Sequence, residues 1–435
     1  MQRAARRIVE KLRLRGHEAF FAGGWVRDFL LRRRARDIDI ATSARPEEVL
    51  RIFPRAHAVG AQFGVVQVRF YGHVYDIATF RTEGPYLDGR HPASVDFAGP
   101  KPDALRRDFT INGLFFDPVA ERIIDYVGGA ADIRKRILRT IGKPEERFLE
   151  DKLRMLRAIR LACELDFRIA TDTMAAMRRL APLILQVSQE RIRDELLKML
   201  TGPAAAQALD LLQTTGLLAA VLPEVEAMRG VEQPAEFHPE GDVYVHTRSV
   251  LALLKDPSPV LALATLLHDV GKPPTRKADE RVHFIGHEEV GARMAEDICR
   301  RLRLPNEDAQ AVTELVREHL RFIHIREMRA GTLRKFLSRP RLAEHLELHR
   351  VDCLSSGRSL EQYDFALEKL RELQAVPARE RLVSGDDLIA MGYPPGPLFR
   401  TILDAVDDLQ AERPDLTREQ ALEEVRRAFP LPPIV

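Results

Sequence analysis

The spacing of hydrophobic positions changes near Gly142. Before it, segments such as 65–70 and 74–79 alternate apolar and polar residues between turn residues, and this predicts the short strands of a small mixed or antiparallel sheet. After it, apolar residues recur every three or four positions. This spacing predicts helices, which we expect over 153–165, 192–200, 260–267 and 311–320. The chain is therefore expected to be α+β, with its sheet confined to the N-terminal third.

Helix-breaking residues mark the expected domain boundaries. They occur at 142–144, 202–203 and 376–377, where Gly or Pro interrupts the helical pattern. The predicted domains are 1–141, 142–203, 204–376 and 377–435. The first holds the sheet, and the other three are expected to be entirely helical.

The segment 21–42 combines a glycine turn with two carboxylates. A strand is expected at 19–21, a tight turn at Gly23-Gly24, a helix from Trp25 and a second strand over 37–40. Glycine allows the backbone to approach phosphate oxygens closely. Residues i and i+2 of a strand face the same side, so Asp37 and Asp39 should project together. Two adjacent carboxylates suit Mg²⁺ with bound substrate phosphates, which makes both aspartates candidate catalytic and metal-binding residues.

Charge and cysteine content narrow the class of protein. The net charge is only +2, but the segment 1–36 holds eleven Lys and Arg against three Asp and Glu, a local excess that suits phosphate contacts. Three scattered cysteines without CxxC spacing favour a reduced, cytoplasmic protein with buried thiols. No apolar run is long enough to predict a membrane span, and the Arg-rich start lacks the apolar core of an export signal. We therefore expect a soluble protein without a membrane partner.

Two further segments carry groups that recognise nucleotides. In 106–113, Arg107 offers a planar fork for phosphate or ribose, and Asn112 offers a donor and an acceptor. In 150–160, Asp151 and Arg154 are three residues apart, and on a helix they would be surface neighbours. Cytosine and adenine both present an amine beside an unprotonated ring nitrogen. A carboxylate acceptor beside a guanidinium donor matches that edge and opposes the edge of uracil or guanine.

These four segments together resemble one enzyme family. GGxVRD at 23–28, DxD at 37–39, RRDFTIN at 106–112 and EDxxRxxRAxR at 150–160 are similar to the motifs of the polymerase β-type nucleotidyltransferases. They are most similar to the class II branch, which contains the CCA-adding enzymes and the bacterial poly(A) polymerases. The resemblance implies a nucleotidyltransferase head followed by a helical neck. It also implies nucleotide contacts from Gly24, Arg27, Arg107, Asp151, Arg154, Arg157 and Arg160.

Two loops bear on which reaction such an enzyme would perform. The polar segment 81–92 resembles the flexible loop of enzymes that switch from C to A addition, and this argues against an enzyme that adds only CC. The segment 60–66 lacks the more basic stretch associated with bacterial poly(A) polymerases. The second feature favours addition to tRNA over poly(A) synthesis.

A second metal centre is expected downstream. His246, His268, Asp269 and Asp352 combine imidazole and carboxylate ligands, which bind divalent transition metals and can activate water for phosphoester hydrolysis. Their spacing resembles the HD phosphohydrolases and implies an active domain, such as the 2′,3′-cyclic phosphodiesterase attached to some CCA-adding enzymes. His287 and His319 are possible further ligands, and the sequence leaves the choice between them open.

The sequence thus predicts a CCA-adding tRNA nucleotidyltransferase with Mg²⁺, CTP, ATP and a tRNA 3′ end as its partners. The segment 382–397 is similar to the tail of the same enzymes. A poly(A) polymerase and an A-only enzyme share nearly every motif and remain alternatives. An HD hydrolase with a nucleotide-binding regulatory head is the alternative from another class. The oligomeric state stays open.

Overall fold

The structure is a computed structural model that describes residues 1–35, 37–58, 64–84, 94–234, 241–278, 282–375, 381–413 and 415–431. The chain forms two compact units. The first comprises Met1–Arg229, Lys255–Leu263 and Asp297–Ala309, and the second comprises Gly230–Leu254, Ala264–Glu296 and Gln310–Val435.

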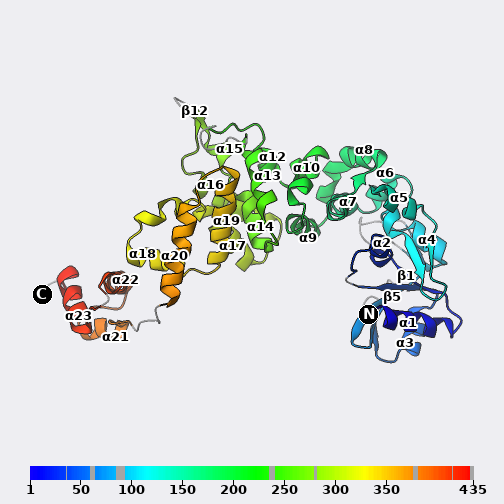
Figure 1. Ribbon diagram of the computed structural model, residues 1–435, viewed down its shortest axis with the longest axis horizontal. Coiled ribbons are helices and arrows are strands. Elements are labelled where there is room, and N and C mark those ends of the chain that lie inside the picture. Colours follow the sequence, from blue (N-terminus) through cyan, green and yellow to red (C-terminus); the bar gives the residue numbers. More distant parts are fainter. Residues whose placement is uncertain are drawn as a thin grey trace. The chain divides into compact units, whose positions relative to one another are not determined.

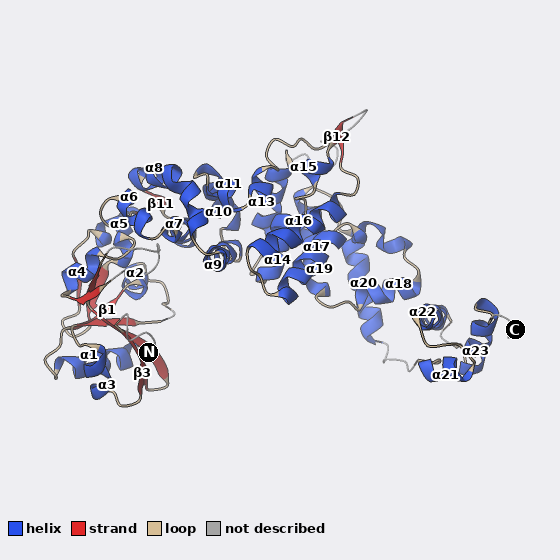
Figure 2. Cartoon of the chain, turned by 180° about the vertical axis from the view of Figure 1, so that it is seen from behind, coloured by secondary structure: helices blue, strands red, loops and turns tan. Residues whose placement is uncertain are grey.

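A mixed sheet lies in the N-terminal part of the first unit (Figures 1 and 2). Strands β2 (Asp39–Thr42) and β5 (His73–Thr79) are parallel, and the other pairs are antiparallel, which confirms the expected mixed sheet. Within the described residues the spatial order is β3 (Ala56–Ala58), β4 (Val65–Phe70), β5, β2, β1 (Ala19–Ala22), β8 (Leu114–Asp117) and β9 (Arg122–Asp125).

The two faces of this sheet differ in what covers them. Register places Ile40, Ile77 and Val66 on one face, and all three are fully buried. Helices α1 (Gln2–Arg13) and α3 (Pro46–Ile52) contact the strands that carry these residues. Because side chains alternate along a strand, Asp39 lies on the opposite face, which remains partly open.

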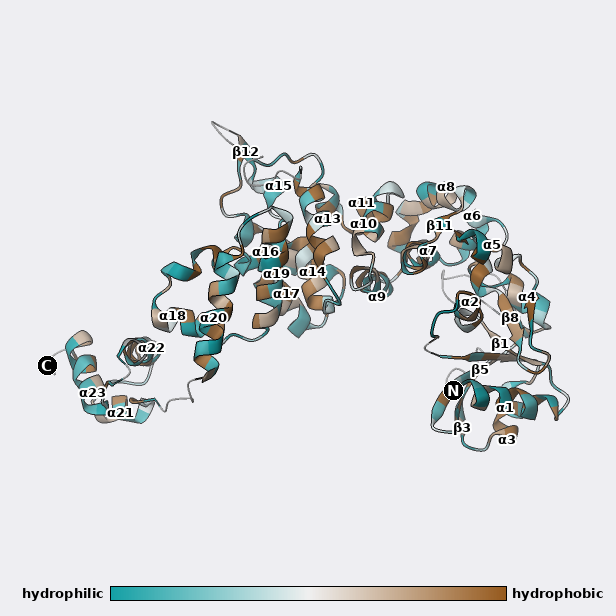
Figure 3. Ribbon diagram, viewed as in Figure 1, coloured by the Kyte–Doolittle hydropathy of each residue, from teal (hydrophilic) through white to brown (hydrophobic). Residues whose placement is uncertain are grey.

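The remaining elements of the first unit are mostly helices. The predicted helix over 153–165 is confirmed as α7 (Leu153–Leu165), and the one over 192–200 lies within α9 (Gln189–Leu200). Both helices carry brown hydrophobic and teal hydrophilic residues (Figure 3), as expected of amphipathic segments. The others are α2 (Gly24–Leu30), α4 (Pro100–Leu105), η2 (Thr110–Asn112), α5 (Gly129–Lys135), α6 (Pro144–Glu150), α8 (Thr171–Leu180), η3 (Ala181–Gln186), α10 (Ala205–Thr214), α11 (Leu217–Val221) and α12 (Pro223–Glu226), with short strands β10 (Ile137–Leu138) and β11 (Arg168–Ile169).

The chain after residue 241 is also helical apart from β12 (Lys277–Ala278) and β13 (Val282–His283). The predicted helix over 260–267 is confirmed within α14 (Pro259–Leu267). The one over 311–320 lies in α17 (Asn306–Glu318), which ends two residues earlier than the pattern. The others are α13 (Val243–Leu253), α15 (Lys272–Thr275), α16 (His287–Arg301), η4 (Arg321–Glu327), α18 (Ala330–Leu337), α19 (Leu342–Ser355), α20 (Glu361–Ala375), α21 (Gly385–Ala390), α22 (Pro397–Glu412) and α23 (Arg418–Ala428).

Several smaller expectations can be compared with the structure. The three cysteines are free and buried, as predicted. Of the predicted loop at 81–92, Arg81–Glu83 forms strand β6, which pairs with β7 (Val95–Phe97), and residues 85–92 lie outside the described residues. Most of the segment 60–66 also lies outside them. No helix in the described part of the chain has the length and apolar character needed to cross a membrane.

Candidate nucleotide and metal sites

The glycine turn between β1 and α2 brings three functional groups together. Gly23 has a φ of 66°, in the left-handed region that glycine adopts without strain. A Cβ at Gly23 would lie 3.3 Å from Arg107 Nη1 and 3.6 Å from Asp39 Oδ2. A larger residue here would therefore crowd the arginine and the carboxylate that approach the turn.

The two aspartates project to one side, but not from one strand. Strand β2 begins at Asp39, so the expectation that Asp37 belongs to this strand was wrong. The alternation itself holds, because Ile38 and Ile40 are buried while both aspartates are exposed. Asp37 lies just before the strand, where no hydrogen-bonded partner strand fixes its backbone.

A third carboxylate, which the sequence did not identify, influences this pair. Partial burial, the negative charge of Asp37 and that of Asp76 together raise the pKa of Asp39 to about 6. Asp76 lies on β5, which pairs with β2 in parallel. The alternation in 74–79 could have shown that Asp76 faces outward, but only the strand pairing places it beside Asp39. A divalent cation would relieve this repulsion, and carboxylate oxygens are the ligands that Mg²⁺ prefers.

Arginines on the opposite side of the turn are held by their own partners. Arg107 Nη2 donates to Asp103 Oδ2 at 3.0 Å, and its guanidinium lies over the Phe115 ring at 5.0 Å. Arg27 Nη1 donates to Asn112 Oδ1 at 2.9 Å. Asp103 is almost fully buried and fixes Arg107, a role that nothing in the local sequence signalled.

The structure corrects the predicted relation between Asp151 and Arg154. Helix α6 ends at Glu150 and α7 begins at Leu153, so the two residues do not share one helix. Asp151 accepts hydrogen bonds from Arg191, while Arg154 Nη1 donates to Glu150 Oε2 at 2.6 Å. Their side chains do not pair with each other, and the two residues are joined by a backbone hydrogen bond from the Arg154 N–H to the Asp151 carbonyl oxygen at 3.1 Å.

The two following arginines pair with residues far away in the sequence. Arg157 Nη2 donates to Asp108 Oδ2 at 2.8 Å, and Arg160 Nε donates to Glu195 Oε2 at 2.6 Å. Burial alone would raise the pKa of Asp108, but the charge and hydrogen bond of Arg157 outweigh it and lower the pKa. The Asp108 carboxylate therefore stays ionised beside Arg157.

All residues predicted for the first site line a single hollow of about 560 Å³. This size is typical of a pocket that binds a small molecule. Its walls combine the glycine turn with six arginines and five carboxylates, so it can hold a polyphosphate with a metal ion. The predicted residues in its wall are Gly24, Arg27, Asp37, Asp39, Arg107, Asp151, Arg154, Arg157 and Arg160.

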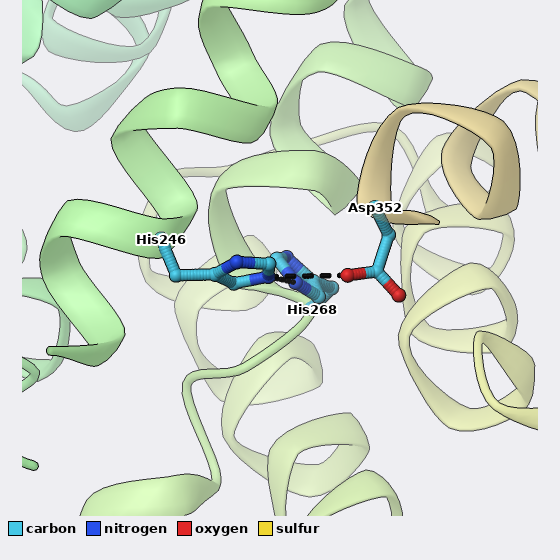
Figure 4. A group of neighbouring side chains, drawn as sticks. All are labelled: His246, His268 and Asp352. Atoms are coloured by element: carbon cyan, nitrogen blue, oxygen red, sulfur yellow. Dashed lines mark hydrogen bonds and ion pairs between the residues drawn. The ribbon is translucent and has the colours of Figure 1, made fainter. Parts of the chain in front are cut away.

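The second predicted site is also assembled, within the second unit. Figure 4 shows His246 of α13, His268 after α14 and Asp352 of α19 pointing toward one another. His268 Nε2 lies 3.3 Å from His246 Nε2, which lies 3.1 Å from Asp352 Oδ1. The three ligand atoms lie close enough together to hold one metal ion.

Both of the histidines that the sequence left undecided belong to this centre. His287 and His319 form a second group with Asp269 whose ligand atoms also lie close together. Asp269 Oδ1 lies 3.4 Å from His287 Nε2 and 3.8 Å from His319 Nε2, while Oδ2 lies 3.3 Å from His268 Nε2. The two oxygens of Asp269 thus face different groups of ligands.

The donor set fits divalent metals. His268, His287 and His319 each place Nδ1 within 2.8 Å of a backbone carbonyl oxygen, which fixes the rings with Nε2 toward the centre. The Nε2 atom of His287 is buried and makes no hydrogen bond. Burial and the neighbouring His268 lower the pKa of His319 to about 3, so it is neutral and able to bind a metal at pH 7.

Gly271, between the metal-site residue Asp269 and α15, allows this centre to form. A Cβ at Gly271 would lie 2.1 Å from the carbonyl oxygen of His287 and 2.5 Å from the backbone nitrogen of Gly291. The segment that carries Asp269 can therefore approach the start of α16 only because residue 271 has no side chain.

Comparison with known proteins relates both sites to one family. The model of the "Poly A polymerase head domain" matches residues 19–139, that of the "Probable RNA and SrmB- binding site of polymerase A" matches 166–229, and that of the "HD domain" matches 243–356. The crystal structure of the Bacillus stearothermophilus CCA-adding enzyme in complex with CTP is 31% identical. The structural match covers 98% of each of the two chains and has a TM-score of 0.76. The chain belongs to the family of the CCA-adding enzymes.

Curated members of this family match about half of the chain at higher identity. The CCA-adding enzyme of Geobacillus stearothermophilus is 48% identical over 211 residues, which are 48% of this chain and 52% of that protein. That of Anoxybacillus flavithermus is 46% identical over 224 residues, 51% of this chain and 56% of that protein. The chain thus spans about half the length of these curated relatives. The Thermotoga maritima CCA-adding enzyme complexed with tRNA_CCA shares the fold, at 18% identity and a TM-score of 0.62.

Proposed function

We propose that this protein adds CCA to tRNA 3′ ends from CTP and ATP and releases pyrophosphate. The observation that carries the proposal is the single hollow that unites Asp37 and Asp39 with the glycine turn and with Asp151 and Arg154. The family relationship supports it, because the 31% identical enzyme was crystallised with CTP.

Each group in the hollow has a role in this reaction. Asp37 and Asp39 would hold Mg²⁺, which when bound orients the triphosphate and favours attack of the RNA 3′-hydroxyl on the α-phosphate. The Gly23-Gly24 backbone leaves space for phosphate oxygens. Arg27 and Arg107 line the hollow beside this turn and would balance the charge of the triphosphate.

Base selection is assigned to Asp151 and Arg154. The Asp151 carboxylate would accept from the exocyclic amine of cytosine or adenine, and Arg154 would donate to the neighbouring ring nitrogen. In the structure the Arg154 guanidinium donates a hydrogen bond to Glu150. To contact the base, Arg154 would have to break this bond and donate to the base instead. Arg157 and Arg160 complete the wall of the hollow.

A second activity, metal-dependent hydrolysis of a phosphoester, is assigned to the HD centre. The observation that favours it is the convergence of His246, His268 and Asp352, and of His287 and His319, on Asp269. These residues would hold divalent transition metals, which when bound supply a nucleophilic hydroxide. A 2′,3′-cyclic phosphate is the substrate implied by the family of the enzyme.

The predicted domains can be assigned to the two proposed activities, nucleotide transfer and phosphoester hydrolysis. Residues 1–141 would form the nucleotidyltransferase head, 142–203 the neck that selects the nucleotide, 204–376 the HD domain and 377–435 the tail. The cytoplasm, where tRNA is processed, is the proposed location.

The decisive test uses tRNA transcripts that end before CCA, after C and after CC, incubated with Mg²⁺ and labelled CTP and ATP, separately and together. Completion of CCA from every start, followed by arrest, supports the proposal. Addition of A to the CC end alone would identify an A-adding enzyme, and unlimited addition of A would identify a poly(A) polymerase.

A further inference from the structure

A second hollow, of about 630 Å³, lies in the head between α1, the end of α3 and the β4–β5 hairpin. We call it the basic groove and define it by Arg7, Lys11, Arg55, Arg69 and Tyr71. It is lined by Val68, which shares the sheet face of Val66 and Ile40. The basic groove therefore lies on the face of the sheet opposite to Asp39, and the proposed transferase reaction does not use it.

The cations of the basic groove lack acidic partners. Within the described part of the chain, Arg7, Lys11, Arg55 and Arg69 form no ion pair with a carboxylate, and all four are exposed. The one acidic residue in the lining, Glu10, accepts from Arg6 at 3.1 Å. Four uncompensated positive charges around one hollow favour a polyanionic ligand.

Aromatic rings are interleaved with these charges. Lys11 Nζ lies 5.2 Å from the centre of the Phe70 ring, and Arg7 lies over the Tyr71 ring at 5.2 Å while donating to its hydroxyl at 2.6 Å. Tyr71 is nevertheless 64% exposed. Cationic grooves with accessible aromatic rings bind single-stranded nucleic acid, because phosphates contact the cations and bases stack on the rings.

The backbone at Tyr71 supports a role for its side chain. Tyr71 and Gly72 join β4 to β5 as a two-residue hairpin loop, with φ values of 47° and 76°. This turn requires positive φ at both positions and favours Asn, Asp or Gly. A tyrosine at the first position costs free energy that asparagine would save. The Tyr71 ring meets the Phe70 ring edge-on, with the ring centres 4.7 Å apart, and stays largely exposed.

From these observations we propose that the basic groove binds single-stranded RNA, with a base against Tyr71 and phosphates against Arg7, Lys11, Arg55 and Arg69. The ligand is a segment of RNA other than the 3′ end that enters the catalytic hollow, because the two hollows lie on opposite faces of the sheet.

The test measures binding of a fluorescein-labelled 12-residue oligouridylate to the full-length protein by anisotropy. The double variant Arg55→Glu/Arg69→Glu is expected to weaken binding at least tenfold and to reduce the slope of log K against log salt by about 1.4, that is about 0.7 per lost contact. The matched control Arg122→Glu/Arg134→Glu changes two exposed cations elsewhere in the head and should change affinity less than twofold. Incorporation of CMP into tRNA should be equal in both variants.

The variant Tyr71→Asn tests whether the aromatic ring contributes to RNA binding independently of the stability of the fold. It is expected to lower RNA affinity about tenfold while the melting temperature stays the same or rises, because asparagine suits the turn. Equal RNA affinity in the wild type and the Arg55→Glu/Arg69→Glu variant would overturn the proposal. So would groove-dependent binding of a labelled 12-residue oligoglutamate as tight as that of the RNA, which would identify an acidic protein segment as the ligand. Binding of free UMP as tight as that of the oligomer would identify a mononucleotide site instead.

Discussion

Arg191 donates two hydrogen bonds to the carboxylate of Asp151, at 2.8 Å to Oδ2 and 3.3 Å to Oδ1. The two residues are 40 positions apart, and α9 carries Arg191 to Asp151, which lines the nucleotide hollow. The forked contact fixes the plane of the carboxylate. It therefore determines which way Asp151 can accept a hydrogen bond from a base.

Loss of either partner is expected to reduce base selection. Asp151→Ala should bring incorporation of UTP and GTP closer to that of CTP and ATP, with little change in melting temperature. Arg191→Ala should lower the ratio of kcat/KM for CTP over UTP about tenfold, which corresponds to ~1.4 kcal/mol, because the carboxylate is no longer oriented. Single-nucleotide incorporation into tRNA measures both ratios. Arg193→Ala is the control, because Arg193 is on the same helix but donates to Asp194 instead of Asp151. Unchanged selectivity in Asp151→Ala would refute the assignment.

The two centres are expected to act independently. Asp37→Ala should reduce nucleotide incorporation by about three orders of magnitude, since a bound metal ion contributes several kcal/mol to such a step. The same variant should hydrolyse a 2′,3′-cyclic nucleotide at the wild-type rate. His268→Ala should show the opposite pattern. Loss of both activities in either variant would instead favour a regulatory head that serves the hydrolase.

The HD centre is expected to hold two metal ions. Each oxygen of Asp269 faces a different group of histidines, so the carboxylate can bridge two ions. After reconstitution with Ni²⁺ and desalting, mass spectrometry of the metal content should give two ions per chain in the wild type and one in His319→Ala. His283→Ala, which changes a histidine in the adjacent cavity outside both groups, should retain two. A single ion in the wild type would contradict the bridging role.

Stability should depend on pH through Asp108. Its pKa is lower in the folded protein than in the unfolded chain, so its ionised form stabilises the fold above a pH of about 4 and this contribution is lost as the pH falls further. Asp108→Asn should lower the free energy of unfolding by about 2 kcal/mol at pH 7, because Arg157 loses a charged acceptor.

Urea denaturation at several pH values measures this difference, which should stay constant from pH 7 to 5 and narrow toward pH 3. Asp166→Asn is the control. It removes a carboxylate from a largely solvent-exposed ion pair with Arg136, and such pairs contribute little to stability. If the difference in unfolding free energy between the wild type and Asp108→Asn instead grew as the pH fell, the Asp108 carboxylate would not be stabilising the fold.

Local sequence determined the elements and the residues of both sites. Apolar spacing placed α7 and β4 at their observed bounds, because periodicity follows directly from the geometry of helix and strand. Short motifs, read together with the family resemblance, named nine of the fifteen residues that line the nucleotide hollow and the six residues of the HD centre, with the choice between His287 and His319 left open.

Tertiary structure alone decided which side chains meet. Asp76 lies beside Asp39 because β5 pairs with β2, and Asp151 binds Arg191 rather than Arg154 because the chain leaves the helix between α6 and α7. In the same way, His287 approaches Asp269 because Gly271 allows close packing against the backbone of His287 and Gly291. The spacing of residues along a chain predicts only which side chains are neighbours within one helix or strand. The contacts described here join elements that are tens of residues apart. Their geometry is fixed by the packing of the whole core.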